Sequence, residues 1–222
     1  MELVEAIKLR HSVRQYKDIP IEEELRRALD CECERLNKES GFDFKVIYDE
    51  PRAFGGRMAG YGRFENAKNY IALIGKDCPD FDEKIGYYGE MLVLFAQTLG
   101  LHTCWVAVTY KKIPEVLLVP DGEKLALVIS IGHGRHRGLP RKSKTREQVS
   151  NISESTPEWF NSGVESALLA PTAMNQQKFR LTYNGDGTVS AKAGLGFYAK
   201  MDLGIVKCHF EIGAGRDSFR WR

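Results

Sequence analysis

Two short, almost uninterrupted apolar segments constrain the fold of this chain most strongly. One runs from Asn69 to Gly75, and the other covers residues 125–131, where Ser130 is the one polar side chain. Segments of this length without a polar face are typical of strands that are buried on both sides. Helical patterns flank both segments, so the sequence predicts a central sheet enclosed by helices.

The elements expected around these strands follow from capping and periodicity. Pro20 and Gly41 bracket an amphipathic helix over residues 21–36, and alternating apolar residues over 42–48 predict a half-buried strand. Asp80 or Asp82 can cap a long helix that ends at Gly100. The inward face expected for that helix comprises Ile85, Tyr88, Met91, Leu92, Phe95 and Leu99. A strand over 102–109 comes next.

A similar order of elements is expected from residue 156 onward. Thr156 as N-cap and Pro157 at the first helical position predict a helix that closes before Ala170-Pro171. Residues 179–183 and 188–193 read as a hairpin that turns at 184–187. A helix over 197–208 and a short strand over 209–212 complete this part. The repeated order favours a diverged internal duplication, although α+β chains also alternate in this way by chance.

Composition excludes several classes of protein. The chain has 222 residues, 43% of them hydrophobic and 28% charged, which suits one core or two half-domains that share a core. A net charge of +2 does not by itself indicate binding to nucleic acid. We find no leader pattern and no apolar run near the roughly 20 residues that span a bilayer, so we expect a cytoplasmic protein without membrane contacts.

The five cysteines lack the close spacing of a disulfide framework or a zinc ribbon. We expect reduced and mostly buried thiols, with Cys31 and Cys33 on different faces of one helix. A metal site would require that His102, Cys104, Cys208 and His209 gather from both halves of the chain. These four residues do not follow a recognised ligand spacing, so no metal is predicted.

Residues 10–16, Arg-His-Ser-Val-Arg-Gln-Tyr, follow a short amphipathic helix over residues 2–9. The helix would present the guanidiniums of Arg10 and Arg14 and the hydroxyl of Ser12 together, an arrangement that can bind a phosphate-tailed ligand. The alternative is that both arginines are solvated residues at a helix end.

Three segments resemble motifs of the FMN-dependent nitroreductase family, in its single-chain branch with fused halves. The first is Ile7–Tyr16, which is similar to the opening arginine, serine and arginine motif. The second is Ala167–Phe179, in which Lys178 and Phe179 replace the proline and tryptophan of the family. The third is Gly100–Val106, followed by the apolar strand to Gly132 and by Pro140-Arg141-Lys142.

The resemblance implies an α+β fold, a three-layer α/β/α arrangement with a mixed, mainly antiparallel sheet and two diverged repeats. Residues 1–150 would form the first half, and residues 151–222 a smaller second half that completes one flavin site in a single intertwined unit. Ordinary members of the family are homodimers whose second motif closely follows the first. Here residues 31–40 lack that motif, so the resemblance implies one FMN per chain and a monomer that can function alone.

The resemblance also implies a set of cofactor-binding residues. Arg10 and Ser12 would serve the phosphate and ribityl side, Arg14 the ring or ribityl oxygens, and Arg141 and Lys142 the phosphate. The remaining implied contacts are His11 in the opening motif, Trp105 beneath the flavin, the backbone at Ala107 and Val108, where the family has glycines, and Asn175 and Gln177 from the second half.

The implied reaction is a ping-pong exchange in which NADH or NADPH reduces FMN, and a nitroaromatic, quinone or similar small molecule reoxidises it. No dinucleotide fingerprint and no side-chain nucleophile are expected, because the flavin carries the chemistry. One alternative is a flavin sensor or reservoir, with hydride donors blocked by Val108 or by the loop over residues 54–63. Nucleic-acid binding by the basic residues between 135 and 146 is disfavoured, because no aromatic residues are interleaved with them.

Overall fold

The computed structural model describes residues 1–56, 61–139 and 141–222. Part of the loop predicted over 54–63 and the Pro140 of the third motif therefore lie outside the described residues. The chain forms two compact units. The first comprises Met1, Leu9–Phe81 and Leu92–Leu139, and the second comprises Glu2–Lys8, Asp82–Met91 and Pro140–Arg222.

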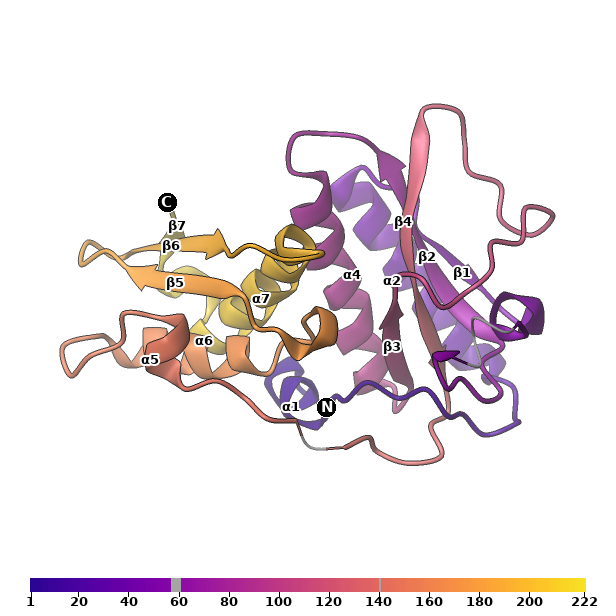
Figure 1. Cartoon of the computed structure of the whole chain (residues 1–222), viewed down its shortest axis with the longest axis horizontal. Helices are drawn as coiled ribbons and strands as arrows, with labels where there is room; N and C mark the ends of the chain where they lie inside the picture. The colour runs from indigo at the N-terminus through magenta and orange to yellow at the C-terminus, as the bar shows by residue number, and fades with distance from the viewer. Residues whose placement is uncertain (57–60, 140) are drawn as a thin grey trace. The chain divides into compact units, whose positions relative to one another are not determined.

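The first unit is built on a four-stranded antiparallel sheet with the strand order β1-β2-β4-β3 (Figure 1). Its two central strands are the predicted apolar segments, which are confirmed, since every residue of β2 except the last is buried. Helix α2 lies beside β1, and the thiol of Cys33 donates to the carbonyl of Phe44. The bounds are α2 (Glu23–Ser40), β1 (Lys45–Ile47), η1 (Pro51–Phe54), β2 (Asn69–Lys76), α4 (Phe81–Thr98), β3 (His102–Val106) and β4 (Glu123–Gly132).

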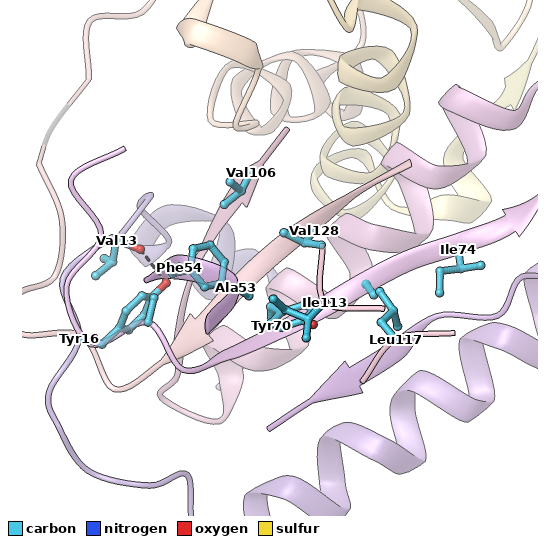
Figure 2. Close-up of a cluster of buried hydrophobic side chains, with 12 residues drawn as sticks. Val13, Tyr16, Ala53, Phe54, Tyr70, Ile74, Val106, Ile113, Leu117 and Val128 are labelled. Carbon is cyan, nitrogen blue, oxygen red and sulfur yellow. Dashed lines mark hydrogen bonds between the residues drawn. The ribbon is translucent and has the colours of Figure 1, made fainter. Parts of the chain in front are cut away.

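One face of this sheet carries a cluster of buried apolar side chains (Figure 2). Alternate residues of the strands point into it, as the period of two in a strand requires. The loops after β1 and β3 close over it and supply Phe54, Ile113 and Leu117. Val13 and Tyr16 also belong to the cluster, so the segment that follows the first helix is part of the core.

The second unit combines helices with a three-stranded sheet of order β5-β6-β7, in which β5 and β6 are antiparallel and β6 and β7 parallel. Helix α7 packs against the hairpin of β5 and β6 (Figure 1). The bounds are α1 (Leu3–Leu9), α5 (Arg146–Val149), α6 (Glu158–Leu168), η2 (Ala173–Asn175), β5 (Phe179–Tyr183), β6 (Thr188–Ala193), α7 (Ala199–Ala214), η3 (Arg216–Ser218) and β7 (Arg220–Trp221).

Glycines let helix α7 contact the first half of α4, residues 82–91, through backbone atoms. A Cβ at Gly86 would lie 2.0 Å from the carbonyl oxygen of Met201, and a Cβ at Gly204 would lie 1.8 Å from that of Glu83. Nearby, the buried His209 ring joins α7 to both neighbouring helices. Its Nδ1 lies 3.1 Å from the Ser166 carbonyl of α6, and its Nε2 lies 2.8 Å from Glu90 of α4.

Several predicted boundaries are wrong for identifiable reasons. Residues 209–212 are not a strand but continue α7, because Phe210 packs on Phe160, with ring centroids 5.7 Å apart. Pro157 rather than Thr156 is the N-cap of α6, and the Thr156 hydroxyl donates to Ser153 instead. The inward face predicted for α4 is only partly correct, since Ile85 and Leu92 are buried but Tyr88, Met91, Phe95 and Leu99 are half-buried, while Val93, Leu94 and Ala96, which were not predicted, are buried. The predicted strand over 42–48 shortens to Lys45–Ile47.

Other expectations are confirmed. Gly41 ends α2 with φ 76°, a conformation that glycine adopts without strain. Cys31 is exposed while Cys33 is buried, so they do lie on different faces. The α+β class with a mainly antiparallel sheet is also confirmed, whereas the internal duplication remains a prediction. In the part of the chain that the structure describes, no helix is both long and apolar enough to cross a membrane.

The helix contact at Gly204 leads to a stability prediction. Gly204→Ala should lower the free energy of unfolding by about 1–3 kcal/mol, because the close helix approach outweighs the better helix propensity of alanine. Urea denaturation measures the change. The matched control is Gly56→Ala, since a Cβ at Gly56 meets nothing within 4 Å. Equal stability of Gly204→Ala and wild type would contradict the contact.

Candidate functional site

In the first unit, the segment that carries the predicted arginines is pinned by backbone hydrogen bonds. The amide of Val13 donates to the carbonyl of Thr103 in β3 over 3.0 Å. The amide of Tyr16 donates to Glu65, and the amide of Glu65 donates back to Arg14, each over 3.0 Å. The segment therefore runs in a fixed register between β3 and a neighbouring loop.

A buried tyrosine hydroxyl fixes the same segment from inside the core. The Tyr16 hydroxyl donates to the carbonyl of Val13 over 2.7 Å (Figure 2), and its oxygen lies 2.8 Å from the hydroxyl of Ser130 in β4. Because the tyrosine has one hydroxyl hydrogen, Ser130 is the donor in the second bond. Burial raises the pKa of Tyr16 well above its usual value, so the hydroxyl stays protonated.

Three of the predicted cofactor-binding residues, Arg10, Ser12 and Arg14, belong to the segment that pairs with β3 next to Cys104, since Ser12 forms a β-bridge with Thr103. Arg10 is buried, with 1% of its surface exposed, whereas Ser12 and Arg14 are exposed. Burial raises the pKa of Cys104, and the charges of Arg14 and Arg10 and a hydrogen bond with Ser12 oppose that shift. Both guanidiniums therefore influence the same thiol of β3 electrostatically. Because Arg10 is buried, it is not a solvated residue at a helix end.

Two histidines belong to the same part of the first unit, His11 in the arginine segment and His102 at the start of β3. His11 donates from Nδ1 to the carbonyl of Leu9 over 3.0 Å, which leaves Nε2 as its acceptor when the ring is neutral. A Cβ at Gly138 would lie 2.2 Å from the His11 Cβ, so the chain packs closely over that ring. Burial, followed by nearby positive charges, lowers the pKa of His102, whose Nδ1 accepts from the amide of Gly134.

The remaining predicted contacts of the first unit lie along and beyond β3. The side chains of Trp105 and Cys104 point to opposite faces of the strand, so Trp105 points away from the face that carries Cys104. Ala107 and Val108 follow the end of β3, and Val108 is 62% exposed. Their backbone role toward a ligand stays a prediction.

In the second unit, Gln177 is a buried connector. Its amide nitrogen donates to the Ser143 hydroxyl over 3.0 Å and to the Leu168 carbonyl over 2.9 Å. Its amide oxygen accepts from the backbone of Lys144 over 2.7 Å, and its own carbonyl accepts from the Lys144 ammonium. Both amide hydrogens are therefore used within the protein, and Gln177 fixes the basic segment 142–144.

Asn175 lies in a conformationally strained loop beside that segment. Its amide nitrogen donates to the carbonyl of Lys142 over 2.7 Å. Arg141, the residue before Lys142, is half-buried. Met174, Asn175 and Gln177 have φ values of 51°, 53° and 46°. Left-handed residues other than glycine each cost about 1–3 kcal/mol and persist only where surrounding contacts hold them.

Sequence reasoning did not assign a role to several residues that build these two clusters. Ser130 was recognisable as the one polar residue of an apolar strand. Tyr16, its hydrogen-bond partner, is the last residue of the arginine motif. Asp202 likewise interrupts an apolar stretch of α7. Ser143 had no comparable signal, because its partner Gln177 is defined only in the folded chain, and Cys104 was noted only within the third motif and as a rejected metal ligand. Within the described residues, no group of three or more His, Cys, Asp or Glu side chains could hold a metal ion.

A family model described as "Putative TM nitroreductase" matches residues 2–214 of the chain. The chain is a member of this nitroreductase family. Its members are oxidoreductases. No curated protein sequence gives a significant match.

Solved structures share the fold of this chain. A "putative nitroreductase" from Thermotoga maritima is 24% identical over 98% of this chain and 85% of its own, with a TM-score of 0.70. An FMN-dependent nitroreductase from Clostridium difficile is 21% identical, covers 68% of this chain and 98% of its own, and has a TM-score of 0.51. A "putative nitroreductase" from Desulfovibrio desulfuricans in complex with FMN is 22% identical, with coverages of 70% and 98% and a TM-score of 0.54.

The burial of Cys104 leads to a prediction of thiol reactivity. In the native protein, an aromatic disulfide reagent should label the exposed Cys31 rapidly and the buried Cys33, Cys104 and Cys208 slowly. Burial raises the pKa of all three buried thiols, that of Cys33 to about 12, which disfavours the reactive thiolate. Stopped-flow absorbance measures the rates. Cys31→Ser should abolish the fastest phase and leave the half-buried Cys78 as the next thiol to react, and rapid labelling of Cys104 in that variant would contradict its burial.

Proposed function

We propose that this nitroreductase-family chain is an FMN-dependent oxidoreductase that takes reducing equivalents from NADH or NADPH and passes them to a nitroaromatic, quinone or similar acceptor. The single observation that carries the proposal is the placement of Arg10, Ser12 and Arg14 on one segment that backbone pairing with Thr103 pins to β3. The FMN named for the Clostridium difficile and Desulfovibrio desulfuricans proteins supports the choice of cofactor.

The chemistry of the donors in this cluster fits FMN. Two guanidiniums provide charge and directed hydrogen bonds for a phosphate, and a pinned backbone presents them with little loss of entropy on binding. The exposed hydroxyl of Ser12 can donate to or accept from a ribityl hydroxyl. The segment therefore has the mixture of cationic and neutral donors that a phosphorylated sugar alcohol needs.

FMN, when bound, supplies the hydride and electron transfer. The residues of this chain would bind and orient it, with Arg10 and Arg14 compensating negative charge. The amides near Ala107 and Val108 would face the flavin ring, as the family resemblance suggests. No side chain of the protein has to act as a nucleophile, and NAD(P)H and the acceptor would use the same open ring face in turn.

We propose further that the second unit contributes to the same cofactor site, with Asn175, Arg141 and the basic segment 142–144, so that one chain holds one FMN and can act as a monomer. The support is the resemblance of Ala167–Phe179 to the second family motif. Gln177 would act here by holding Ser143 and Lys144, since its own amide group is engaged.

The decisive experiment is an absorbance spectrum of the purified protein with FMN added, followed by NADPH or NADH under argon. We expect flavin bands near a one-to-one ratio that bleach on addition of the donor. Bound flavin that does not bleach with either nucleotide would favour a sensor or reservoir. Failure to bind FMN would overturn the proposal.

Replacement of Arg10 tests the phosphate contact. Arg10→Met keeps most of the aliphatic stem but removes the charge, so FMN affinity should fall by about 1.5–3 kcal/mol. Quenching of flavin fluorescence measures the dissociation constant, and circular dichroism confirms the fold. The control is Arg27→Met, which replaces an exposed arginine of α2. If Arg10→Met and the control bind FMN with equal affinity, Arg10 does not contact the phosphate.

Replacement of Asn175 tests the contribution of the second unit. Asn175→Gly removes the carboxamide but tolerates the positive φ, so FMN affinity should fall by about 0.5–1.5 kcal/mol. Met174→Gly is the matched control, because Met174 shares the loop and has φ 51°. If the flavin spectrum and affinity of Asn175→Gly match those of the control, Asn175 does not contact the cofactor.

A further inference from the structure

Asp202 connects helix α7 to the strained loop that carries Asn175. The residue lies in the first turn of the helix, with 3% of its surface exposed. Its Oδ1 accepts from the backbone amide of Ala173 over 2.8 Å, and its Oδ2 accepts from the side-chain amide of Gln176 over 2.7 Å. Both oxygens of one buried carboxylate therefore hold residues of the same short loop.

That loop needs an external restraint. Three of its four residues from 174 to 177 have positive φ although none is glycine. Such conformations are uncommon for these residues and revert when the contacts around them are lost. Beside Asp202, the Thr172 hydroxyl accepts from the backbone amide of Gln177 over 3.0 Å, and the Gln176 amide also donates to the carbonyl of Phe197.

A charged side chain at this position has a cost that a neutral one avoids. Burial raises the pKa of Asp202, and the hydrogen bonds from Ala173 and Gln176 act against that shift. An asparagine would fill the same space without burying a charge, but it has only one acceptor atom. The carboxylate is thus suited to this place because two donors converge on it.

The restraint extends to the basic segment of the second unit. Within the loop, Asn175 holds the carbonyl of Lys142, and Gln177 holds Ser143 and the backbone of Lys144. A shift of the loop would therefore move the basic segment as well. Asp202 stands at the start of this chain of hydrogen bonds. It would act on a bound cofactor through Asn175 and the basic segment and not by direct contact.

We propose that Asp202 is a positioning residue, which holds residues 172–177 so that Asn175 and the basic segment 142–144 are preorganised to receive FMN. The inference rests on the proposed function. It adds that affinity for the flavin depends on a buried carboxylate that acts through Gln176 and Ala173 rather than by contact with the cofactor.

The test compares Asp202→Asn with Asp217→Asn, a change of the same kind at an exposed site of the second unit. We expect the FMN dissociation constant of Asp202→Asn to rise about tenfold or more, since two donors then share one acceptor. Amide hydrogen exchange of the flavin-free protein should accelerate in residues 172–177, while α6 and α7 keep their protection. Asp217→Asn should match wild type in both measurements.

A double-mutant cycle separates positioning from general stability. Gln176→Ala should weaken FMN binding by itself, and Asp202→Asn should add little in that background, because both changes break the same link. Full additivity, or faster loop exchange with an unchanged dissociation constant, would overturn the positioning role while the proposed function stands. Absence of FMN binding by wild type would overturn the proposed function and this inference together.

Discussion

The hydroxyl of Tyr16 is the contact on which the arrangement of the first unit depends. It joins the carbonyl of Val13 to Ser130 on the central strand β4, and so ties the arginine segment to the sheet through the core. A buried hydroxyl without such partners would be costly, which means that the segment cannot leave its register without exposing or orphaning polar groups. The positions of the backbone at Arg10, Ser12 and Arg14 are therefore consequences of core packing rather than of a surface loop.

In the second unit, hydrogen bonds of buried side chains fix the loop that carries Asn175. Among the described residues this loop, from Thr172 to Gln177, pairs with no strand, and its backbone is strained. Two buried polar side chains hold the loop instead. Gln177 donates to Leu168 and accepts from Lys144, and Asp202 accepts from Ala173 and Gln176. Networks of this kind are stable only when every member is satisfied, and they then specify a single conformation.

The contrast between the two units explains what the sequence could predict. Strands β2 and β4 were recognisable because apolar runs report burial directly, and Gly41 marked the end of α2 because its conformation is local. The strand predicted over residues 209–212 was wrong because a short apolar run fits either element, and the contact of Phe210 with Phe160 decides for a helix. The arginine motif carried a signal in its residue types, whereas the role of Asp202 depends on donors about thirty residues earlier in the chain.

A physical distinction between the two kinds of site residue follows. Arg10 and Arg14 are suited to a ligand by their charge, so their residue types alone make the motif recognisable in the sequence. Gln177 belongs to the same resemblance, yet both of its amide hydrogens are donated within the protein, to Ser143 and Leu168, and its amide oxygen accepts from Lys144. A motif can thus mark residues that shape a site without touching its ligand. Under the proposed function, such shaping would reduce the entropy lost when FMN binds, and the strain in the loop from Met174 to Gln177 would be the cost of that order.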